Sequence, residues 1–519
     1  MTIAEKHPTF KRSPIEFGDF QTPVSLANQV LKITRDRMQH EPKSIFEPTC
    51  GIGNLLFAAL ETFPNVSQAR GFEINPSYVL EAKSRSSQLQ VTQADFFTVN
   101  LEDVFIQLEQ PILIVGNPPW VTNTAIAASG GTNLPSKQTQ QGFNGLEAMT
   151  GKSNFDLSEA ILQRLLERIS RTENMLAMIV KTAVARKLLQ YASRQRLGIC
   201  NAAMYAIDAK REFGAAVDAC VFYCDGTTET PDYTAQIFEH LSVDQPSHSI
   251  GFEGLQLIAD THAHARAKDF IGPSPIEWRS GIKHDAAKVM ELWTNGDHLK
   301  NGWGERVDLE TTHLFPMFKS SDLGNARTQI NRAFMLVTQQ FIGESTHMLE
   351  QTAPRTWAYL NKHQHVLKAR GSSIYKNNPS FSIFGVGKYS FQPWKVAISG
   401  MYKIPQFSLI GPISGRPVVF DDTCYFLPCQ SEAQARVIHV ILNSRQTQDV
   451  LRAIVFWDEK RPITKERLNQ INLTALANTL EDQLLSELLE TVDVQSRSAI
   501  RAAWKSLAQK REEVPSLFG

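Results

Sequence analysis

The sequence contains few cysteines, no long apolar run and no excess of either charge. Six cysteines in 519 residues are too few for a disulfide framework, and Cys220 and Cys224 lack the C-x-x-C pair or nearby histidine that would complete a zinc site. No window approaches the ~18 apolar residues of a membrane span, and the first residues, MTIAEKHPTFKR, lack the apolar core of a signal peptide. We therefore expect a soluble, cytoplasmic protein with no metal and no membrane contact.

Charge is balanced overall but not along the chain. Lysine and arginine number 53, and so do aspartate and glutamate. Residues 1–250 hold 22 basic and 26 acidic side chains, whereas residues 251–519 hold 31 and 27. This mild asymmetry is compatible with a second half that faces a polyanion such as nucleic acid, without requiring one.

Short apolar segments alternate with amphipathic ones through the first 115 residues. The periodicity predicts helices over 24–38, 51–62 and 76–87, and strands over 44–46, 69–72, 91–95 and 112–115. Such alternation is typical of a parallel, doubly wound sheet, so the expected fold class is α/β and Rossmann-like. Ligands of these sheets bind at the carboxyl ends of the strands, which is where the unusual residues of this chain fall.

The regular alternation stops at residue 122. Residues 122–154 are rich in glycine, serine, threonine, asparagine and glutamine, which is typical of a functional loop or a disordered segment. Beyond them we expect a helix over 157–169, strands over 175–180 and 217–224, and helices over 431–445 and 464–512. The polar segment 225–250 indicates a boundary. The expected organisation is one domain over 1–245 and a mixed α/β region with a helical C-terminal part over 246–519.

Three patterns follow the first three expected strands. FEPTCGIG (46–53) places glycines where a strand turns into a helix, as in many cofactor sites, although it is not G-x-G-x-x-G. GFEINP (71–76) ends a strand at Glu73, about 20 residues beyond Gly53, the spacing of a ribose-binding carboxylate. QADFF (93–97) offers a carboxylate and a ring to an adenine. Each pattern alone is also explained by an ordinary turn, a helix N-cap or a core phenylalanine.

The fourth pattern, IVGNPPW (114–120), is the most specific. Two consecutive prolines after an apolar strand remove two backbone donors and fix a stiff turn. This turn would present the side chain of Asn117 and the carbonyl of Pro118 as two acceptors at one place. Two fixed acceptors suit the two N–H groups of an exocyclic amine, and Trp120 beside them suits stacking on a base.

Taken together, FEPTCGIG, GFEINP, QADFF and GNPPW resemble the successive motifs of the gamma-arranged adenine-N6 DNA methyltransferases. The resemblance extends upstream to FGDFQTPVSLANQVL (17–31) and downstream to EFGAAVDACVFYC (212–224). It therefore covers about residues 17–224. It implies a Rossmann-like methyltransferase catalytic domain with S-adenosyl-L-methionine as cofactor, followed by a target-recognition region for double-stranded DNA.

The resemblance implies cofactor-binding roles for ten residues. Seven would surround the amino-acid part of the cofactor: Thr22, Pro23, Glu47, Pro48, Cys50, Gly51 and Gly53. Glu73 would bind the ribose. Asp95 and Phe96 would hold the adenine.

The resemblance also implies a catalytic turn that receives the target base. This turn consists of Asn117, Pro118, Pro119 and Trp120, and Phe213 would cover the second face of the base. The chain departs from the family in carrying Trp120 where tyrosine or phenylalanine is more frequent, and in lacking an aspartate before the turn. Because tryptophan still stacks on a base, the departure bears on the identity of the target base more than on the reaction.

The implied mechanism needs no covalent enzyme intermediate. The target amine lies inside the duplex, so its nucleotide must be flipped out. The two acceptors would favour a tetrahedral nitrogen whose lone pair attacks the methyl group, so that orientation and electrostatics supply most of the rate. A cysteine nucleophile would instead need a Pro-Cys pair near the cofactor motifs, and Pro428-Cys429 lies far from them in the sequence.

The block 368–403 interleaves lysine and arginine with tyrosine, phenylalanine and tryptophan. This mixture suits phosphate contacts and base-edge reading, and its glycine-rich alternation indicates hairpins. A compact mixed domain with aromatic residues in its core explains the block equally well. The DNA contacts expected in it are Arg370, Lys376, Lys388 and Lys395.

The function indicated by these patterns is sequence-specific methylation of adenine N6 in DNA, within a restriction–modification or phage-defence system. A separate restriction endonuclease or defence-system subunits remain open as partners. Four alternatives also remain open: a cytosine-N4 DNA methyltransferase, an RNA adenine methyltransferase, a protein-amide methyltransferase and a non-catalytic DNA-binding specificity subunit. A nuclease based on Asp458-Glu459-Lys460 is disfavoured, because a solvated turn explains this lone D-x-K pattern better.

Overall fold

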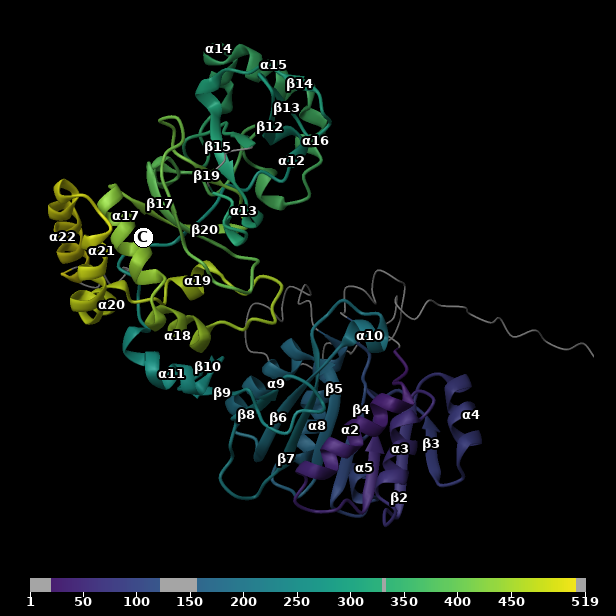
Figure 1. Cartoon of the computed structure of the whole chain (residues 1–519). Coiled ribbons are helices and arrows are strands. Elements are labelled where there is room, and N and C mark those ends of the chain that lie inside the picture. Colours follow the sequence, from purple (N-terminus) through teal and green to yellow (C-terminus); the bar gives the residue numbers. More distant parts are fainter. Residues whose placement is uncertain (1–19, 122–155, 329–332, 510–519) are drawn as a thin grey trace, which may run out of the picture. The chain divides into compact units, whose positions relative to one another are not determined.

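The computed structural model describes residues 20–121, 156–328 and 333–509. The chain divides between Thr261 and His262 into two units (Figure 1). The polar segment 122–154 lies outside the described residues, as do residues 17–19 of the upstream motif.

Ten strands of the first unit form one sheet in the order β10-β9-β8-β6-β7-β5-β4-β1-β2-β3. Their bounds are β1 (Ser44–Glu47), β2 (Gln68–Glu73), β3 (Leu89–Gln93), β4 (Ile112–Gly116), β5 (Met175–Lys181), β6 (Ile199–Ile207), β7 (Ala219–Gly226), β8 (Ala235–Phe238), β9 (His248–Glu253) and β10 (Gln256–Ile258). Strands β1 to β5 are mutually parallel, and β7 runs antiparallel between β5 and β6.

The strand order reverses between β1 and β4. From β1 the chain proceeds outward through β2 and β3, and then returns to place β4 and β5 on the other side of β1. The carboxyl ends of β1 and β4 therefore flank the crevice in which doubly wound sheets bind their ligands. Every residue of these two strands is buried, as expected for parallel strands that helices cover on both faces.

Helices cover both faces of this sheet (Figure 1). Their bounds are α2 (Val24–Arg37), α3 (Asn54–Thr62), α4 (Pro76–Arg85), α5 (Leu101–Ile106), α8 (Leu157–Ile169), α9 (Thr182–Gln195) and α10 (Ala209–Phe213). Helices α2, α3 and α4 bury their apolar sides in one cluster with Ile45 and Leu113 of the sheet. The buried side chains of α5, α8 and α9 lie outside that cluster, and α8 packs against both α5 and α9. The predicted doubly wound, Rossmann-like α/β arrangement is confirmed.

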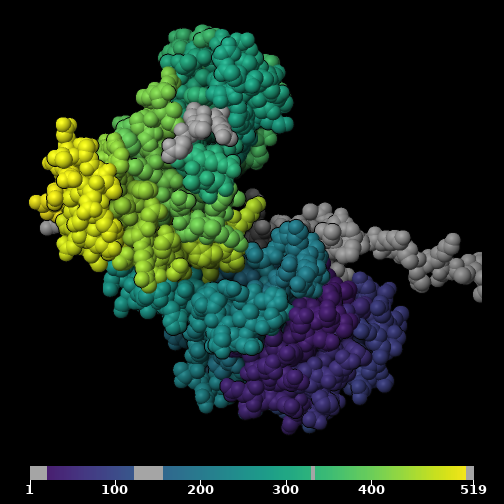
Figure 2. All heavy atoms as spheres, viewed as in Figure 1, coloured from purple at the N-terminus to yellow at the C-terminus, as the bar shows by residue number. Residues whose placement is uncertain are grey.

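The N-terminal helix is tied to a distant part of the same sheet. Arg37, at the end of α2, donates hydrogen bonds to Asn201 Oδ1 at 2.7 Å and to Gln236 Oε1 at 3.1 Å. Figure 2 shows the N-terminal segment in purple lying against the blue and teal segments that follow residue 156. These contacts hold the start of the unit beside its antiparallel half.

The division expected at residues 245/246 falls between β8 and β9, inside this sheet. Strand β8 pairs in parallel with β6, and β9 pairs antiparallel with β8. Segment 225–250 thus contains β8 itself and the connections on either side of it. The structure instead places the division between Thr261 and His262.

The second unit contains two sheets, ordered β14-β13-β12-β16-β15-β19 and β11-β20-β17-β18. The strand bounds are β11 (Arg279–Ser280), β12 (Glu291–Asn295), β13 (His298–Lys300), β14 (Arg306–Val307), β15 (Leu314–Phe318), β16 (Ala333–Leu336), β17 (Trp394–Ser399), β18 (Ser408–Ile410), β19 (Val419–Phe420) and β20 (Cys424–Cys429). The unit is therefore of mixed α/β type, as expected.

Helices occur throughout the second unit and are concentrated in its C-terminal part, after residue 431. The bounds are α11 (Thr261–Ala267), α12 (Ala287–Met290), α13 (Ser320–Gly324), α14 (Leu349–Thr352), α15 (Pro354–Lys362), α16 (Gln364–Lys368), α17 (Glu432–Leu442), α18 (Arg445–Ile454), α19 (Lys465–Leu468), α20 (Leu473–Leu480), α21 (Ser486–Glu490) and α22 (Val494–Ala508). Helices α17, α18, α20 and α22 share one core with strands of the four-stranded sheet. None of the described helices combines the length and apolar character that a membrane span needs.

The hairpins expected within 368–403 are absent from residues 369–393, which form turns and two short 3-10 segments; strand β17 begins at Trp394. Phe384 pairs through its backbone with Lys283, and side chains satisfy other parts of the backbone there. The carbonyl of Phe381 accepts from Thr338 Oγ1 at 2.7 Å, and the Ile383 N–H donates to Gln339 Oε1 at 2.8 Å. Because these partners are far away in the sequence, the local alternation could not reveal them.

Candidate active site

The first element of the site is the turn between β1 and α3. Gly51 and Gly53 adopt φ values of +52° and +82°, in the left-handed region that favours glycine. Gly53 stands at the N-cap of α3, so the turn leads directly into a helix N-terminus. Pro48 and Cys50 are buried within it, and burial raises the pKa of the Cys50 thiol above its ordinary value. The FEPTCGIG pattern therefore forms the glycine-rich strand–helix turn that was predicted.

Glu73 stands at the end of β2, next to this turn. Its Oε2 accepts a hydrogen bond from the Gly51 N–H at 2.8 Å, and its Oε1 accepts one from the Asn75 N–H at 2.7 Å. The carboxylate is thus fixed beside the glycine turn. This is the place required of a group that meets a ribose.

Glu47, the last residue of β1, is a carboxyl group in an apolar environment. It is only 2% exposed, and its Oε2 has no hydrogen-bond partner among the described residues. Burial raises its pKa well above the ordinary value, the Leu56 backbone N–H opposes this shift, and the charge of Glu73 adds to it. A buried carboxyl oxygen without a partner is costly. A ligand carrying a cationic amine would supply the missing partner.

Asp95 and Phe96 follow β3. The Asp95 Oδ1 accepts from the Phe97 N–H at 2.9 Å. Phe96 is 4% exposed, and the Arg164 guanidinium lies 5.1 Å from its ring centroid. Asp95 therefore stays partly open at the sheet edge, whereas most of the Phe96 ring packs inside the unit and leaves little of its surface to a ligand.

Asn117 begins the turn that follows β4. Its Nδ2 donates to the Phe20 carbonyl at 3.0 Å and lies 3.3 Å from Thr22 Oγ1. Because a backbone carbonyl only accepts hydrogen bonds, the amide nitrogen must face Phe20. The Asn117 Oδ1 consequently points away from that carbonyl and is presented as an acceptor. Gly116 packs against β5 so closely that an added Cβ would lie 2.9 Å from Met178 Cε.

Three aromatic rings meet beside this turn. The Trp120 centroid lies 5.6 Å from that of Phe20 and 5.2 Å from that of Phe213, and the Phe20 and Phe213 centroids are 5.7 Å apart. The Trp120 indole N–H donates to the Ile179 carbonyl at 3.4 Å, and its side chain is 6% exposed. The structure thus brings together Trp120 and Phe213, which are 93 positions apart in the sequence, and adds Phe20, which the sequence patterns did not single out.

A partly buried ion pair holds the other end of the turn. Lys181, the last residue of β5, donates through Nζ to the Trp120 carbonyl at 3.0 Å and to Asp156 Oδ2 at 2.6 Å. Asp156 caps the N-terminus of α8 by accepting from the Ser158 N–H at 3.1 Å. The sequence analysis missed both residues. The signal was the charged Lys181 directly after an apolar strand, at the same sheet edge as Asn117.

The upstream motif lies between the two turns. Gln21 Oε1 accepts from the Ile52 N–H at 3.1 Å, and the Thr22 carbonyl accepts from Asn54 Nδ2 at 2.7 Å. Pro23 forms the N-cap of α2. Residues Phe20, Gln21 and Thr22, which we call the bridging segment, therefore connect the glycine turn to Asn117.

Comparison with known proteins identifies the chain at the level of its family. No family model matches it. It is 43% identical over 476 residues to the type II methyltransferase M.NspV of Nostoc sp. (strain ATCC 29411 / PCC 7524), and the match covers 91% of this chain and 99% of the relative. The chain belongs to the type II methyltransferases.

Other similarities are shorter or more distant. The type II methyltransferase M.CvrRI of Paramecium bursaria Chlorella virus XZ-6E is 31% identical over 112 residues, covering 22% of this chain and 27% of the relative. Among solved structures, the type IIL restriction-modification enzyme MmeI in complex with DNA is 13% identical, with a TM-score of 0.48, and the match covers 96% of this chain and 72% of that one.

The type II methyltransferase described here is thus a DNA methyltransferase of the restriction–modification class, and S-adenosyl-L-methionine is its cofactor. The residues present fit this cofactor. Its amino-acid part carries an ammonium group, which suits Glu47 Oε2, an oxygen with no partner in the part of the chain that the structure describes. Its ribose hydroxyls suit the fixed carboxylate of Glu73.

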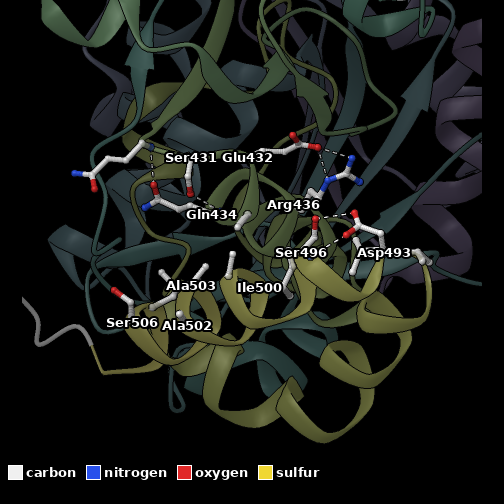
Figure 3. A pocket seen from close by; sticks show the side chains of 16 residues that line it. Ser431, Glu432, Gln434, Arg436, Asp493, Ser496, Ile500, Ala502, Ala503 and Ser506 are labelled. Atoms are coloured by element: carbon white, nitrogen blue, oxygen red, sulfur yellow. Dashed lines mark hydrogen bonds and ion pairs between the residues drawn. The ribbon is translucent and has the colours of Figure 1, made fainter.

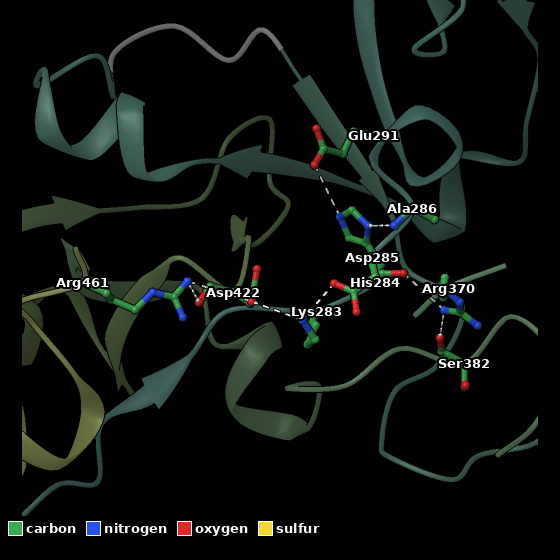
Figure 4. A network of polar contacts seen from close by, with 9 residues as sticks. All are labelled: Lys283, His284, Asp285, Ala286, Glu291, Arg370, Ser382, Asp422 and Arg461. Atoms are coloured by element: carbon green, nitrogen blue, oxygen red, sulfur yellow. Dashed lines mark hydrogen bonds and ion pairs between the residues drawn. The ribbon is translucent and has the colours of Figure 1, made fainter. Parts of the chain in front are cut away.

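The four basic residues that were expected to contact DNA differ in exposure. Lys376 and Lys388 are exposed. Arg370 instead donates to the carbonyls of Ser382 at 2.7 Å and His284 at 3.3 Å (Figure 4), and its guanidinium stacks on Tyr375. It holds three loop segments together, which explains its partial burial.

The structure contradicts the prediction that Lys395 contacts DNA. It is 1% exposed in β17, and its Nζ donates to the carbonyls of Gln392 and Val418. Burial lowers the pKa of Lys395 to about 7. A phosphate cannot reach an ammonium so enclosed, so Lys395 is not among the DNA contacts of this methyltransferase.

A pocket of about 700 Å³ lies in the second unit between α17 and α22 (Figure 3). The polar side chains that line it bond to close neighbours in the sequence: Arg436 pairs with Glu432 on α17, and Asp493, which caps α22, accepts from Ser496 on that helix. Small side chains such as Ala502 and Ala503 line the rest. The pocket contains none of the residues predicted for the cofactor or the base. Among the described residues, no group of three or more His, Cys, Asp and Glu side chains is arranged to hold a metal ion.

Proposed function

We propose that this methyltransferase transfers the methyl group of S-adenosyl-L-methionine to the N6 amine of an adenine flipped out of double-stranded DNA. The observation that carries the proposal is the orientation of Asn117. Its amide nitrogen is held by the Phe20 carbonyl at 3.0 Å, so the amide oxygen is the end that a substrate meets. An acceptor at this position matches an exocyclic N–H donor.

In the proposed mechanism, Asn117 and Pro118 act only through hydrogen bonds. The cofactor, when bound, supplies an electrophilic methyl group on a sulfonium. The Asn117 Oδ1 and the Pro118 carbonyl each accept one N–H of the target amine, which withdraws the nitrogen lone pair from the ring and aims it for attack. The nitrogen–carbon bond would form as the carbon–sulfur bond breaks, with its electron pair left on the departing thioether sulfur, and the methylated nitrogen would release one proton to water. Orientation and electrostatics are the sources of rate enhancement.

The aromatic cluster of Phe20, Trp120 and Phe213 is the proposed binding place of the flipped base. Flipping costs roughly a few kcal/mol, and stacking on an aromatic ring returns about 1–3 kcal/mol per base. The ring centroids of Trp120 and Phe213 are 5.2 Å apart in this structure, which leaves no room for a base between the two rings. Phe213 ends the five-residue helix α10, just before Gly214. Displacement of this short helix would open the second face of the base while Trp120 stays anchored.

The cofactor roles carried over from the family remain part of the proposal. The residues proposed around the amino-acid part are Thr22, Pro23, Glu47, Pro48, Cys50, Gly51 and Gly53, with Glu73 at the ribose and Asp95 and Phe96 at the adenine. The positions of Glu47 and Glu73 beside the glycine turn support this set most strongly.

The second unit is proposed to select the DNA sequence, with Lys376 and Lys388 as phosphate contacts. A separate restriction endonuclease is the proposed partner. A covalent mechanism is not favoured, because Cys429 is fully buried in β20 of the second unit and burial raises the pKa of its thiol to about 12.

The test compares the purified wild type with Asn117→Ala. Cofactor affinity is measured by calorimetry, and methyl transfer to DNA is measured in a single turnover. We expect the variant to bind S-adenosyl-L-methionine within about twofold of the wild type and to lose at least about a hundredfold in transfer rate. Asn361→Ala, on α15 of the second unit, is the matched control and should change neither. Full activity of Asn117→Ala would overturn the proposed mechanism.

A further inference from the structure

The bridging segment contacts Asn117 through two acceptors rather than one. The Asn117 Nδ2 carries two hydrogens. One is directed to the Phe20 carbonyl at 3.0 Å, and Thr22 Oγ1 stands 3.3 Å from the same nitrogen. Together the two acceptors account for the full donor capacity of the amide nitrogen.

Burial makes the second acceptor important. Thr22 is 6% exposed, so water does not readily replace its hydroxyl. With one acceptor alone, the amide can turn about the remaining hydrogen bond. With two acceptors, the plane of the amide is fixed, and so is the direction of its oxygen.

The segment that carries these acceptors is itself fixed. The Thr22 carbonyl accepts from Asn54 Nδ2 at 2.7 Å, and Gln21 Oε1 accepts from the Ile52 N–H at 3.1 Å. Asn54 is held in turn by Arg85, which also donates to the Ile52 carbonyl at 3.1 Å. The Phe20 ring packs on Trp120. Thr22 thus stands on a rigid support between the cofactor turn and the catalytic turn.

We propose that Thr22 is a positioning residue for Asn117: its hydroxyl oxygen accepts the second amide hydrogen and so directs Asn117 Oδ1 at the target amine. The inference rests on the proposed function, because it takes Asn117 as the group that receives that amine. It gives Thr22 a role in the transfer step that is separate from the cofactor contact implied by family resemblance.

The test uses two substitutions of Thr22 that separate the hydroxyl from the shape of the side chain. Thr22→Val keeps the shape and removes the acceptor, whereas Thr22→Ser keeps the acceptor. The single-turnover rate of methyl transfer is measured at saturating cofactor and DNA, and the Kd for S-adenosyl-L-methionine is measured separately. We expect Thr22→Val to lower the rate roughly five- to tenfold even at saturating cofactor, which a weakened cofactor contact alone would not do. Thr22→Ser should restore most of the rate.

Thr34→Val is the matched control. Thr34 is 1% exposed on α2, and its hydroxyl donates to the Val30 carbonyl at 2.7 Å, so the substitution removes an equally buried hydroxyl that does not touch the site. It should leave the rate and the Kd unchanged. A rate loss of the same size in Thr34→Val would attribute the effect of Thr22→Val to general packing and would overturn the inference.

Two further results would also overturn it. One is a Kd for the cofactor raised more than tenfold by Thr22→Val with an unchanged rate at saturation, which would make Thr22 a cofactor contact alone. The other is wild-type behaviour in both measurements. Failure of the proposed function is distinguishable, because it would appear as full activity of Asn117→Ala or as methylation of another base by the wild type.

Discussion

At the residue scale, Glu47 combines a folding cost with a proposed binding role. Its carboxyl group is buried at the end of β1, and one of its oxygens lacks a partner among the described residues. Burial raises the pKa of this group well above its ordinary value. The folded state therefore binds the proton more tightly than the unfolded state, and stability falls as the pH rises above the ordinary carboxyl pKa toward the raised one. A bound ammonium group would offset this cost.

Glu47→Gln should separate the two effects. The neutral amide removes the cost of a buried charge, so without cofactor the variant should melt at a higher temperature than the wild type at pH 7, and this difference should shrink as the pH approaches 4.5. The same change removes the negative charge proposed to face the cofactor ammonium and leaves only an amide oxygen as acceptor. We expect the Kd for S-adenosyl-L-methionine to rise roughly 10- to 100-fold.

Thermal melts with and without cofactor between pH 4.5 and 8 measure both quantities. Glu61→Gln, an exposed position on α3, is the control and should alter neither the melting temperature nor the Kd. An unchanged cofactor affinity in Glu47→Gln would remove Glu47 from the binding site.

At the element scale, the end of β5 supports the catalytic turn that follows β4. Lys181 joins the Trp120 carbonyl to Asp156 at the start of α8. The side chains of Lys181 and Asp156 are 23% and 8% exposed, so the pair is shielded from much of the solvent. The Leu157 N–H also donates to the Val121 carbonyl at 2.9 Å. The strand, the turn and the helix are thus joined at one point.

Lys181→Met should loosen this junction. We expect the transfer rate to fall roughly tenfold, and the free energy of unfolding to fall on the order of 1–3 kcal/mol because Asp156 loses its partner. Single-turnover assays and chemical denaturation check the two values. Lys187→Met is the control: it removes the 2.8 Å pair with the buried Glu159 and should reduce stability without reducing the rate per folded molecule. Equal rates in the two variants would show that Lys181 does not support the turn.

The elements of the first unit were predictable where the signal is local. The spacing of apolar residues correctly indicated α2, α8 and the parallel strands β1 to β5, because in each of these elements the apolar residues of the sequence are the ones that the fold buries. Strands β8 and β9 were missed because their own residues show no strand pattern. They are extended because they pair with neighbouring strands, β8 with β6 and β9 with β8.

The site was predictable to a similar extent. The turn at Asn117 is marked by two prolines, and Phe213, which was expected on the second face of the base, lies beside Trp120. Phe20 reaches the site only through folding, and no local pattern marks it, whereas the one local signal for Lys181 is its charge directly after an apolar strand. Lys395 shows the opposite error, since a side chain predicted to contact DNA is 1% exposed and donates to two backbone carbonyls.

At the scale of the whole molecule, a neutral chain must bind a polyanion. The formal net charge is zero, so affinity for DNA has to come from local clusters of basic side chains rather than from the total charge. Lys376 and Lys388 are exposed and belong to the second unit, which is the proposed target-recognition region.

Reversal of both charges, Lys376→Glu with Lys388→Glu, should weaken DNA binding and reduce its salt dependence. Each lost phosphate contact should make the slope of log Kd against log salt concentration shallower by about 0.9. The slope of the double variant should therefore be shallower than that of the wild type by nearly two. Binding titrations over a range of salt concentrations measure this. Lys32→Glu with Lys83→Glu, exposed on helices of the first unit, is the control. An unchanged slope in the first double variant would exclude these lysines as contacts.

Nucleoside mass spectrometry tests the central claim most directly. DNA is taken from a methylation-free host that expresses the wild-type chain, and from the same host that expresses Asn117→Ala at an equal level. The account predicts N6-methyladenine with the wild type and none, or a trace, with the variant. N4-methylcytosine with the wild type, or equal N6-methyladenine in both strains, would contradict it.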